Sequence, residues 1–183
     1  ELVLIDAGAE VGGYAADVSR TFPVSPRFEP AQRDLYQLVL DAQVATIDAV
    51  EPGTTLDLLH QIAVRVLAEG MVTLGLLEGP LDRVMEQEEF KCFYPHQTSH
   101  WLGLDVHDVG RYFIDDEPRP LVEGMVFTVE PGLYVPLHGT GAPEVFRGLG
   151  VRIEDDLLVT ASGHENLSAG IPKEVEDLEA LKR

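Results

Sequence analysis

Apolar runs near both ends of the chain predict β-strands. Residues 2–5 are continuously apolar and predict a buried strand that ends at Asp6. Residues 7–13 contain three glycines and predict a turn, after which residues 14–21 resume as a second strand. Asp6 and Asp17 are therefore expected on one hairpin. Further β-like runs occupy residues 125–129, 133–135, 151–153 and 157–160.

The middle of the chain has helical periodicity instead. Apolar residues recur at three- and four-residue steps from Ala31, and Pro52-Gly53 ends this helix. Thr54, with Asp57 three residues later, resembles a capping box and predicts a second helix that runs to about Gly70. We expect a helical excursion over 71–90, a short strand over 91–94, a surface loop over 111–120, and a charged helix or frayed tail from residue 173.

Strands, two helices and then more strands predict an α+β domain with an antiparallel sheet. The chain has 183 residues, 45% of them apolar, enough for one domain with a real core. We therefore treat residues 1–183 as a single domain. No apolar run approaches ~18 residues and no basic leader opens the chain, so neither a membrane span nor a signal peptide is expected.

Charge and cysteine content narrow the possible partners. The chain has 13 Lys+Arg against 32 Asp+Glu, a net charge of −19, which argues against binding to nucleic acid. The single cysteine, Cys92, cannot form an intrachain disulfide. That favours a reducing compartment, and we expect the protein in the cytoplasm.

Candidate chemistry gathers around one histidine-rich stretch. His96, His100 and His107 lie within twelve residues, although the whole chain has six histidines. Asp6, Asp17, Glu130 and Glu154 each lie in a β-like or turn-bounded run. An ionised carboxylate at the end of a buried strand is costly unless it is paired or coordinated. One imidazole and four carboxylates suggest a buried metal site.

Simpler interpretations exist for several of these residues. Arg20 lies close enough in sequence to form an ion pair with Asp17, and Arg152 lies on the same strand face as Glu154. A lone His100 would usually be a satisfied core residue. His60, between apolar positions of the second helix, is expected to be a structural or surface histidine rather than a ligand.

Charge counting favours two metal ions. Four carboxylates carry −4, so two divalent ions bring the sum to zero and leave room for a bridging hydroxide. Ions about 3.5–4 Å apart can share carboxylates and activate one water between them. Oxygen ligands with one imidazole suit manganese first and also iron, cobalt or zinc, but they do not suit a thiolate-type zinc site.

Four runs together resemble a known family: DAGAEVGGYAADVSRTFPV, HQTSHWLGLDVHDVG, EPGLY and GVRIEDD. They are similar to the pita-bread metallopeptidases, most of all to the aminopeptidase P (Xaa-Pro aminopeptidase) group and next to the prolidases. The resemblance extends from Leu2 to about Ser168. It implies a curved antiparallel sheet backed by helices, and a dimetal aminopeptidase that cleaves the N-terminal Xaa-Pro bond of peptides.

The same resemblance implies a role for each matching residue. Asp17 and Glu154 would bridge the two ions, Glu130 would also shuttle a proton to the leaving nitrogen, and His107 would help stabilise the oxyanion. The proline ring would be bordered by His96, Tyr134 and Arg152. Gln97 departs from the glycine usual after the first histidine, which bears on the shape of that pocket. The implied metal ligands are Asp6, Asp17, His100, Glu130 and Glu154.

Two other functions stay open at this point. A prolidase would cleave only Xaa-Pro dipeptides, whereas a non-catalytic pita-bread module would bind peptides without cleaving them. All five ligand positions are intact, which argues against the non-catalytic module. Methionine aminopeptidase shares the order of ligands but fits SHWLGLDVHDVG poorly.

The expected partners are a peptide with proline at its second position and a homo-oligomeric copy. A further expectation concerns a preceding segment of the same protein. Asp6 is only the sixth residue of the chain and follows a strand over residues 2–5, and a raw terminus frays. Such a strand also has an open edge. We therefore expect this chain to be the C-terminal portion of a longer protein, with the N-terminal segment in the same polypeptide or as a separate chain.

Overall fold

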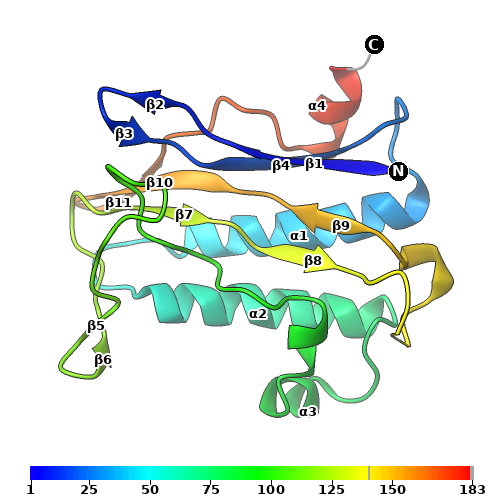
Figure 1. The fold of residues 1–183 in the computed structure, drawn as a ribbon. Helices are drawn as coiled ribbons and strands as arrows, with labels where there is room; N and C mark the ends of the chain where they lie inside the picture. The colour runs from blue at the N-terminus through cyan, green and yellow to red at the C-terminus, as the bar shows by residue number, and fades with distance from the viewer. Residues whose placement is uncertain (140, 182–183) are drawn as a thin grey trace.

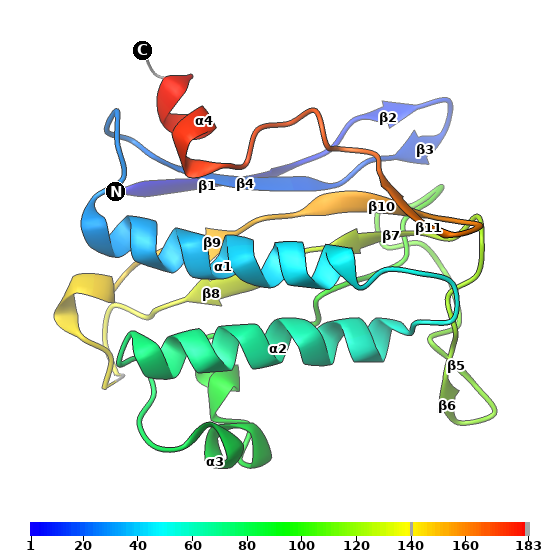
Figure 2. The same cartoon turned by 180° about the vertical axis from the view of Figure 1, so that it is seen from behind.

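Strands and helices form two layers in the computed structural model, which describes residues 1–139 and 141–181. The long helices α1 (Pro30–Asp48) and α2 (Leu56–Thr73) lie behind the strands in Figure 1 and in front of them in Figure 2. They cover one face of the strand layer. No helix in the described ranges is both long and apolar enough to cross a membrane.

The strands are all paired antiparallel. Strand β1 pairs with β4, β10 lies between β7 and β11, and β8 pairs with β9. Residues 98–102 run alongside β7, because the N–H groups of Thr128 and Glu130 donate to the carbonyls of His100 and Thr98. The antiparallel α+β architecture is as predicted. The bounds are β1 Leu2–Ala7, β4 Val18–Pro23, β7 Val126–Val129, β8 Gly132–Tyr134, β9 Gly150–Arg152, β10 Asp155–Thr160 and β11 Gly163–Asn166.

The core lies between the helices and the strands. Apolar residues of α1 and α2 pack there at helical spacing, among them the fully buried Leu35, Val39 and Leu67. Gly70 brings the two helices close together, since a Cβ at this position would lie 2.1 Å from Leu38 Cδ1. Burial of this apolar face is the main force that fixes the helices on the sheet.

The start of α2 differs from the prediction by one residue. Thr55, not Thr54, is the N-cap, and its hydroxyl accepts a hydrogen bond from the Leu58 N–H at 3.1 Å. Asp57 does not complete a capping box, because its carboxylate accepts from the Gln61 side chain one turn later. The Thr54 carbonyl instead accepts a hydrogen bond from the Leu121 N–H.

Two predicted segments take other conformations. The predicted strand over 91–94 is wrong, since residues Glu89–Cys92 form the 3-10 helix η1, which buries Phe90, and Tyr94 is buried two residues after its end. The predicted loop over 111–120 contains a short hairpin of β5 (Phe113–Ile114) and β6 (Glu117–Pro118). Asp115 and Asp116 form its turn with φ of 50° and 66°, the left-handed pair that two-residue hairpins favour.

The remaining elements are small. Strand β11 was not predicted, because its GHEN sequence lacks apolar alternation. The predicted excursion over 71–90 contains one short helix, and the tail forms another. These elements are the hairpin β2 (Glu10–Val11) and β3 (Tyr14–Ala15), the helices α3 (Leu81–Glu86) and α4 (Val175–Ala180), and the 3-10 helix η2 (Glu144–Phe146).

Candidate metal centre

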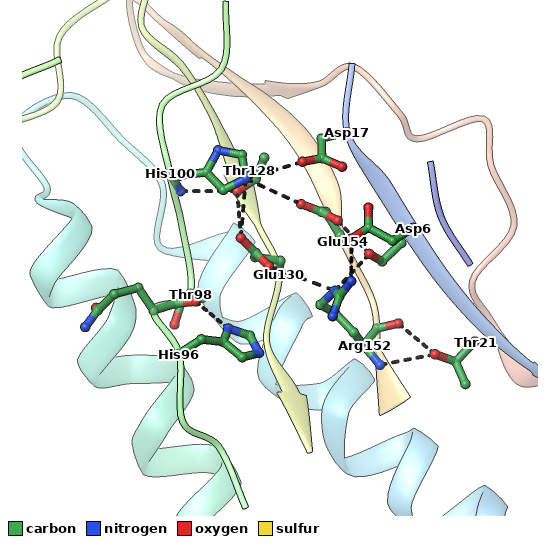
Figure 3. Close-up of polar contacts among 12 residues, drawn as sticks. Asp6, Asp17, Thr21, His96, Thr98, His100, Thr128, Glu130, Arg152 and Glu154 are labelled. Atoms are coloured by element: carbon green, nitrogen blue, oxygen red, sulfur yellow. Dashed lines mark hydrogen bonds and ion pairs between the residues drawn. The ribbon is translucent and has the colours of Figure 1, made fainter. Parts of the chain in front are cut away.

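Polar residues from strand ends converge on the face of the sheet opposite the helices (Figure 3). His100 Nε2 lies 3.4 Å from Asp17 Oδ2, 3.4 Å from Glu130 Oε1 and 4.0 Å from Glu154 Oε1. Donor atoms of Asp17, His100 and Glu154 all lie within 4.8 Å of one another. Four of the five predicted ligands therefore surround one point.

Asp6, on β1, is linked to the same cluster by Arg152. Its Oδ2 accepts from Arg152 Nη2 at 2.5 Å, and Arg152 Nε lies 4.0 Å from Glu130 Oε2. The hypothesis of an Arg152–Glu154 ion pair is thus wrong, because Arg152 pairs with Asp6 across the sheet. All five predicted ligands are brought together.

The alternative ion pair between Arg20 and Asp17 is also wrong. Arg20 extends to the other face of the strand and binds Asp155 at 2.7 Å. Strand alternation explains this difference, since Arg20 and Asp17 lie three positions apart and so face opposite sides. Asp17 therefore faces the cluster rather than Arg20.

The cluster holds more negative charge than its surroundings neutralise. Burial, reinforced by the neighbouring acids, raises the pKa of Glu154 to about 8. Burial also raises the pKa of Glu130 to about 7, although Arg152 opposes this shift. Burial and Asp6 raise the pKa of Asp17. Four carboxylates with one neighbouring guanidinium, beside one imidazole nitrogen, fit divalent metal ions.

Hydrogen bonds orient His100 toward the carboxylates. Its Nδ1 lies 3.1 Å from the Trp101 carbonyl, which can only accept, so Nδ1 carries the proton and Nε2 presents its lone pair. Its backbone N–H donates to Thr128 Oγ1, and that hydroxyl lies 3.5 Å from Glu130 Oε1. Such outer contacts hold metal-binding imidazoles in place.

Side chains behind the cluster were missed by the sequence analysis. Ser19 donates to Glu154 Oε2 at 2.7 Å, and Thr21 exchanges hydrogen bonds with the backbone of Arg152. Their spacing from Asp17 on β4, two and four residues, was the available signal. Short hydroxyl side chains are too common for that spacing to have been decisive.

The three residues expected around the proline ring contact one another. His96 Nε2 lies 2.8 Å from the Tyr134 hydroxyl, which also accepts from Arg152 Nη1 at 3.1 Å. The backbone carbonyl oxygen of Gln97 lies 2.8 Å from His96 Nδ1.

The His107 side chain is exposed, whereas that of His60 is half-buried. The His107 ring packs edge-on against His100 with centroids 4.5 Å apart, and His107 lines a pocket of about 410 Å³ together with Asp6 and Asp17. His60 binds the Thr98 hydroxyl at 2.8 Å and so has the contact expected of a structural histidine.

Comparisons with known proteins agree on one family. The family model of metallopeptidase family M24 matches residues 1–161. The chain is 48% identical over 181 residues to the Xaa-Pro aminopeptidase of Haemophilus influenzae, covering 99% of this chain and 42% of that protein. The Xaa-Pro aminopeptidase of Escherichia coli is also 48% identical, with 99% and 41% covered.

Solved structures give the same result for the fold. Aminopeptidase PepP of Pseudomonas aeruginosa superimposes with a TM-score of 0.97 at 49% identity, covering 99% of this chain and 41% of that one. The predicted pita-bread fold is confirmed by this likeness. The chain spans about two-fifths of the length of the relatives that it matches. The extent of the family match and the identity to these relatives establish that the chain belongs to metallopeptidase family M24.

Proposed function

We propose that this chain carries the catalytic centre of a metal-dependent Xaa-Pro aminopeptidase, which removes the residue that precedes proline at a peptide's N-terminus. The observation that carries the proposal is the convergence of Asp17, His100 and Glu154 within 4.8 Å, with Glu130 and Asp6 beside them. Relatives named Xaa-Pro aminopeptidase are 48% identical to the chain, which supports the choice of substrate.

Five residues would hold two divalent ions, with Asp17 and Glu154 between them. They are Asp6, Asp17, His100, Glu130 and Glu154, a set whose four carboxylates two divalent ions would neutralise. Manganese is our first choice and cobalt, zinc or iron the alternatives, because oxygen donors dominate the set. When bound, such ions polarise a carbonyl and lower the pKa of a water molecule.

Glu130 is the proton carrier in this proposal. An X-Pro bond is a tertiary amide, so its nitrogen has no hydrogen and needs a proton to leave as an amine. As a carboxylate beside the bound ions, Glu130 can accept a proton from the attacking water and return it to the leaving nitrogen. Its two oxygens lie toward His100 and Arg152, within the cluster.

His107 and His96 contact the substrate on either side of the scissile bond. His107 lines the pocket beside Asp6 and Asp17, where its N–H can donate to the carbonyl oxygen as negative charge develops there. The His96 ring packs edge-on against Tyr94 and tilted against Tyr134, at centroid distances of 4.9 and 5.5 Å. These rings, together with Arg152, form a wall suited to the proline ring.

The proposal extends to the rest of the protein. Residues 1–183 act as the catalytic domain, and an N-terminal segment of the same protein completes the enzyme, in the same polypeptide or as a separate chain. The matched relatives are more than twice as long as the shared region, which supports such a segment. We also propose a cytoplasmic homo-oligomer; the free, exposed Cys92 fits a reducing compartment.

Three peptides test the activity of the full-length protein loaded with Mn²⁺. We expect it to release the N-terminal residue from Ala-Pro-Ala and to leave Ala-Ala-Ala intact. Cleavage of the dipeptide Ala-Pro alone would make the protein a prolidase. Binding of Ala-Pro-Ala without cleavage, with any of the four metals, would overturn the proposal in favour of a peptide-binding module.

A further inference from the structure

We propose that Ser19 is a positioning residue that fixes Glu154 and Arg152 relative to each other and thereby strengthens metal binding. The inference rests on the proposed metal centre. It starts from the place of Ser19 on β4, opposite Asp6 in the β1–β4 register and two residues after Asp17. Residues two apart on a strand share a face, so Ser19 lies on the face that carries the metal ligands.

The Ser19 hydroxyl bridges two titratable groups of the site. It donates to Glu154 Oε2 at 2.7 Å and accepts from Arg152 Nε at 2.9 Å. Ser19 is 0% exposed and Glu154 is 1% exposed, so water cannot replace either bond without rearrangement. A second link joins the backbones, because the Glu154 N–H donates to the Ser19 carbonyl at 3.1 Å.

This contact sets which oxygen of Glu154 faces which neighbour. Oε2 is directed at Ser19, whereas Oε1 lies 4.0 Å from His100 Nε2 and faces the cluster. A carboxylate oxygen has two lone pairs, so Oε2 can accept from Ser19 and still coordinate an ion. Ser19 therefore orients the carboxylate without blocking it.

The same hydroxyl separates Glu154 from the nearby guanidinium. Arg152 donates through Nε to Ser19, through Nη1 to Tyr134 and through Nη2 to Asp6, so its three nitrogens have distinct partners. The hydroxyl of Thr21, the next residue on this face of β4, donates to the Arg152 carbonyl and accepts from the Arg152 N–H. Loss of the Ser19 hydroxyl would free Nε to compete with metal for the carboxylates.

Ser168 offers a matched control elsewhere in the molecule. It is also a buried serine, 7% exposed, and its hydroxyl donates to a buried carboxylate at 2.8 Å. That carboxylate belongs to Asp155, which Arg20 and Lys173 already neutralise. Ser168→Ala therefore removes a similar bond without touching a proposed metal ligand.

The test is calorimetric titration of the metal-free full-length protein with Mn²⁺. We expect Ser19→Ala to weaken Mn²⁺ binding about 10- to 100-fold, the usual effect of losing an outer contact to a metal ligand. Ser168→Ala is expected to leave the Mn²⁺ Kd unchanged while lowering Tm. Ser19→Thr keeps the hydroxyl and should recover most of the lost affinity.

The outcomes separate this inference from the proposed function. A native protein that binds none of Mn²⁺, Co²⁺, Zn²⁺ and Fe²⁺ overturns the metal centre and the inference together. A native protein that binds Mn²⁺ beside a Ser19→Ala variant of equal affinity overturns the inference alone, as does a Ser19→Thr variant as weak as Ser19→Ala. If Ser19→Ala does not fold, Ser19→Cys replaces it, because a thiol is only a weak donor.

Discussion

Glu154 and Asp155 are adjacent in the chain and equally inaccessible, yet their carboxyl groups behave in opposite ways. Glu154 is 1% exposed and Asp155 is 0% exposed. Burial and the neighbouring Glu130 raise the pKa of Glu154 to about 8. Burial acts on Asp155 too, but Arg20 and Lys173 outweigh it and hold the pKa of Asp155 at about 2.

The difference follows from the two faces of one extended segment. Asp155 faces cations of the protein itself, Arg20 Nη2 at 2.7 Å and Lys173 Nζ at 2.6 Å. Glu154 faces the opposite side, where its neighbours include other acids and the neutral hydroxyl of Ser19. A buried acid with internal cations supports the fold, whereas one without them supports binding of an external cation.

Asp155→Asn should cause the largest loss of stability. The variant leaves the buried Arg20 and the half-buried Lys173 without their shared counter-charge, and loss of one partner of a buried pair typically costs about 3–5 kcal/mol in the free energy of unfolding. Urea unfolding of the metal-free protein, followed by circular dichroism, measures this loss. A loss below about 1 kcal/mol, the usual size for an exposed pair, would contradict the structural role of Asp155.

Glu154→Gln is the matched control for this prediction. The pKa of Glu154 is higher in the folded protein than in the unfolded chain, so its ionisation opposes folding above the unfolded value. Removal of that charge should leave the metal-free protein equally stable or more stable at pH 7, while Mn²⁺ binding weakens. Equal destabilisation by Asp155→Asn and Glu154→Gln would contradict the proposed contrast between these two acids.

Glu130→Gln is expected to have the next largest effect, on turnover. Loss of a proton carrier should lower kcat at least about 100-fold, or roughly 2.7 kcal/mol in activation free energy. The measurement is kcat on Ala-Pro-Ala at saturating Mn²⁺, with metal content checked. Glu165→Gln, at an exposed position on β11, is the control. Near-normal turnover by a folded, metal-loaded Glu130→Gln protein would remove Glu130 from the mechanism.

Much of the fold was predictable because its signals are local. A continuous apolar run marked β1, a β-like run marked β7, and three- to four-residue periodicity marked α1 and α2. Short elements were not predictable in the same way. The hairpin of β5 and β6 depends on two aspartates at positive φ, and η1 forms where Phe90 and Tyr94 become buried.

The candidate ligands were predictable because each is an acid or histidine beside an apolar run. The residues that contact these ligands were not predictable, since they are of common types and reach the site only through pairing between distant strands. Arg152 meets Asp6 across 146 residues of sequence, and Ser19 meets Glu154 across 135. The partner of Arg20 also depended on strand alternation, which places it toward Asp155 rather than Asp17.

Acid should erase part of the contribution of Asp155. Its folded pKa of about 2 lies below its unfolded value of 3.8, so the contribution is complete above about pH 5 and is mostly lost as the pH falls to 2. The expected size is about 2 kcal/mol. Urea unfolding between pH 5 and 2.5 gives the free energy of unfolding of the native protein and of Asp155→Asn. The difference between the two should narrow as the pH falls. A difference that stays constant over this range would contradict the low pKa.

A further prediction concerns Mn²⁺ binding as a function of pH. In the metal-free protein Glu154 has a pKa of about 8 and Glu130 of about 7, so both are mostly protonated at pH 6. A metal ion must displace these protons, and its apparent affinity should therefore fall as the pH is lowered from 8 to 6. Each displaced proton costs up to about tenfold in Kd, or 1.4 kcal/mol, per pH unit below the pKa.

Calorimetric titration at pH 6.5 in two buffers of different ionisation enthalpy counts the protons released on Mn²⁺ binding. Glu154→Gln should reduce the count, since Gln carries no acidic proton for the ion to displace. Asp155, already ionised at this pH, has no such proton to release. A conservative change of its partner, Lys173→Arg, should therefore leave the count unchanged. An Mn²⁺ affinity independent of pH between 6 and 8 would show that the two glutamates are ionised before metal arrives, and the contrast with Asp155 would then fail.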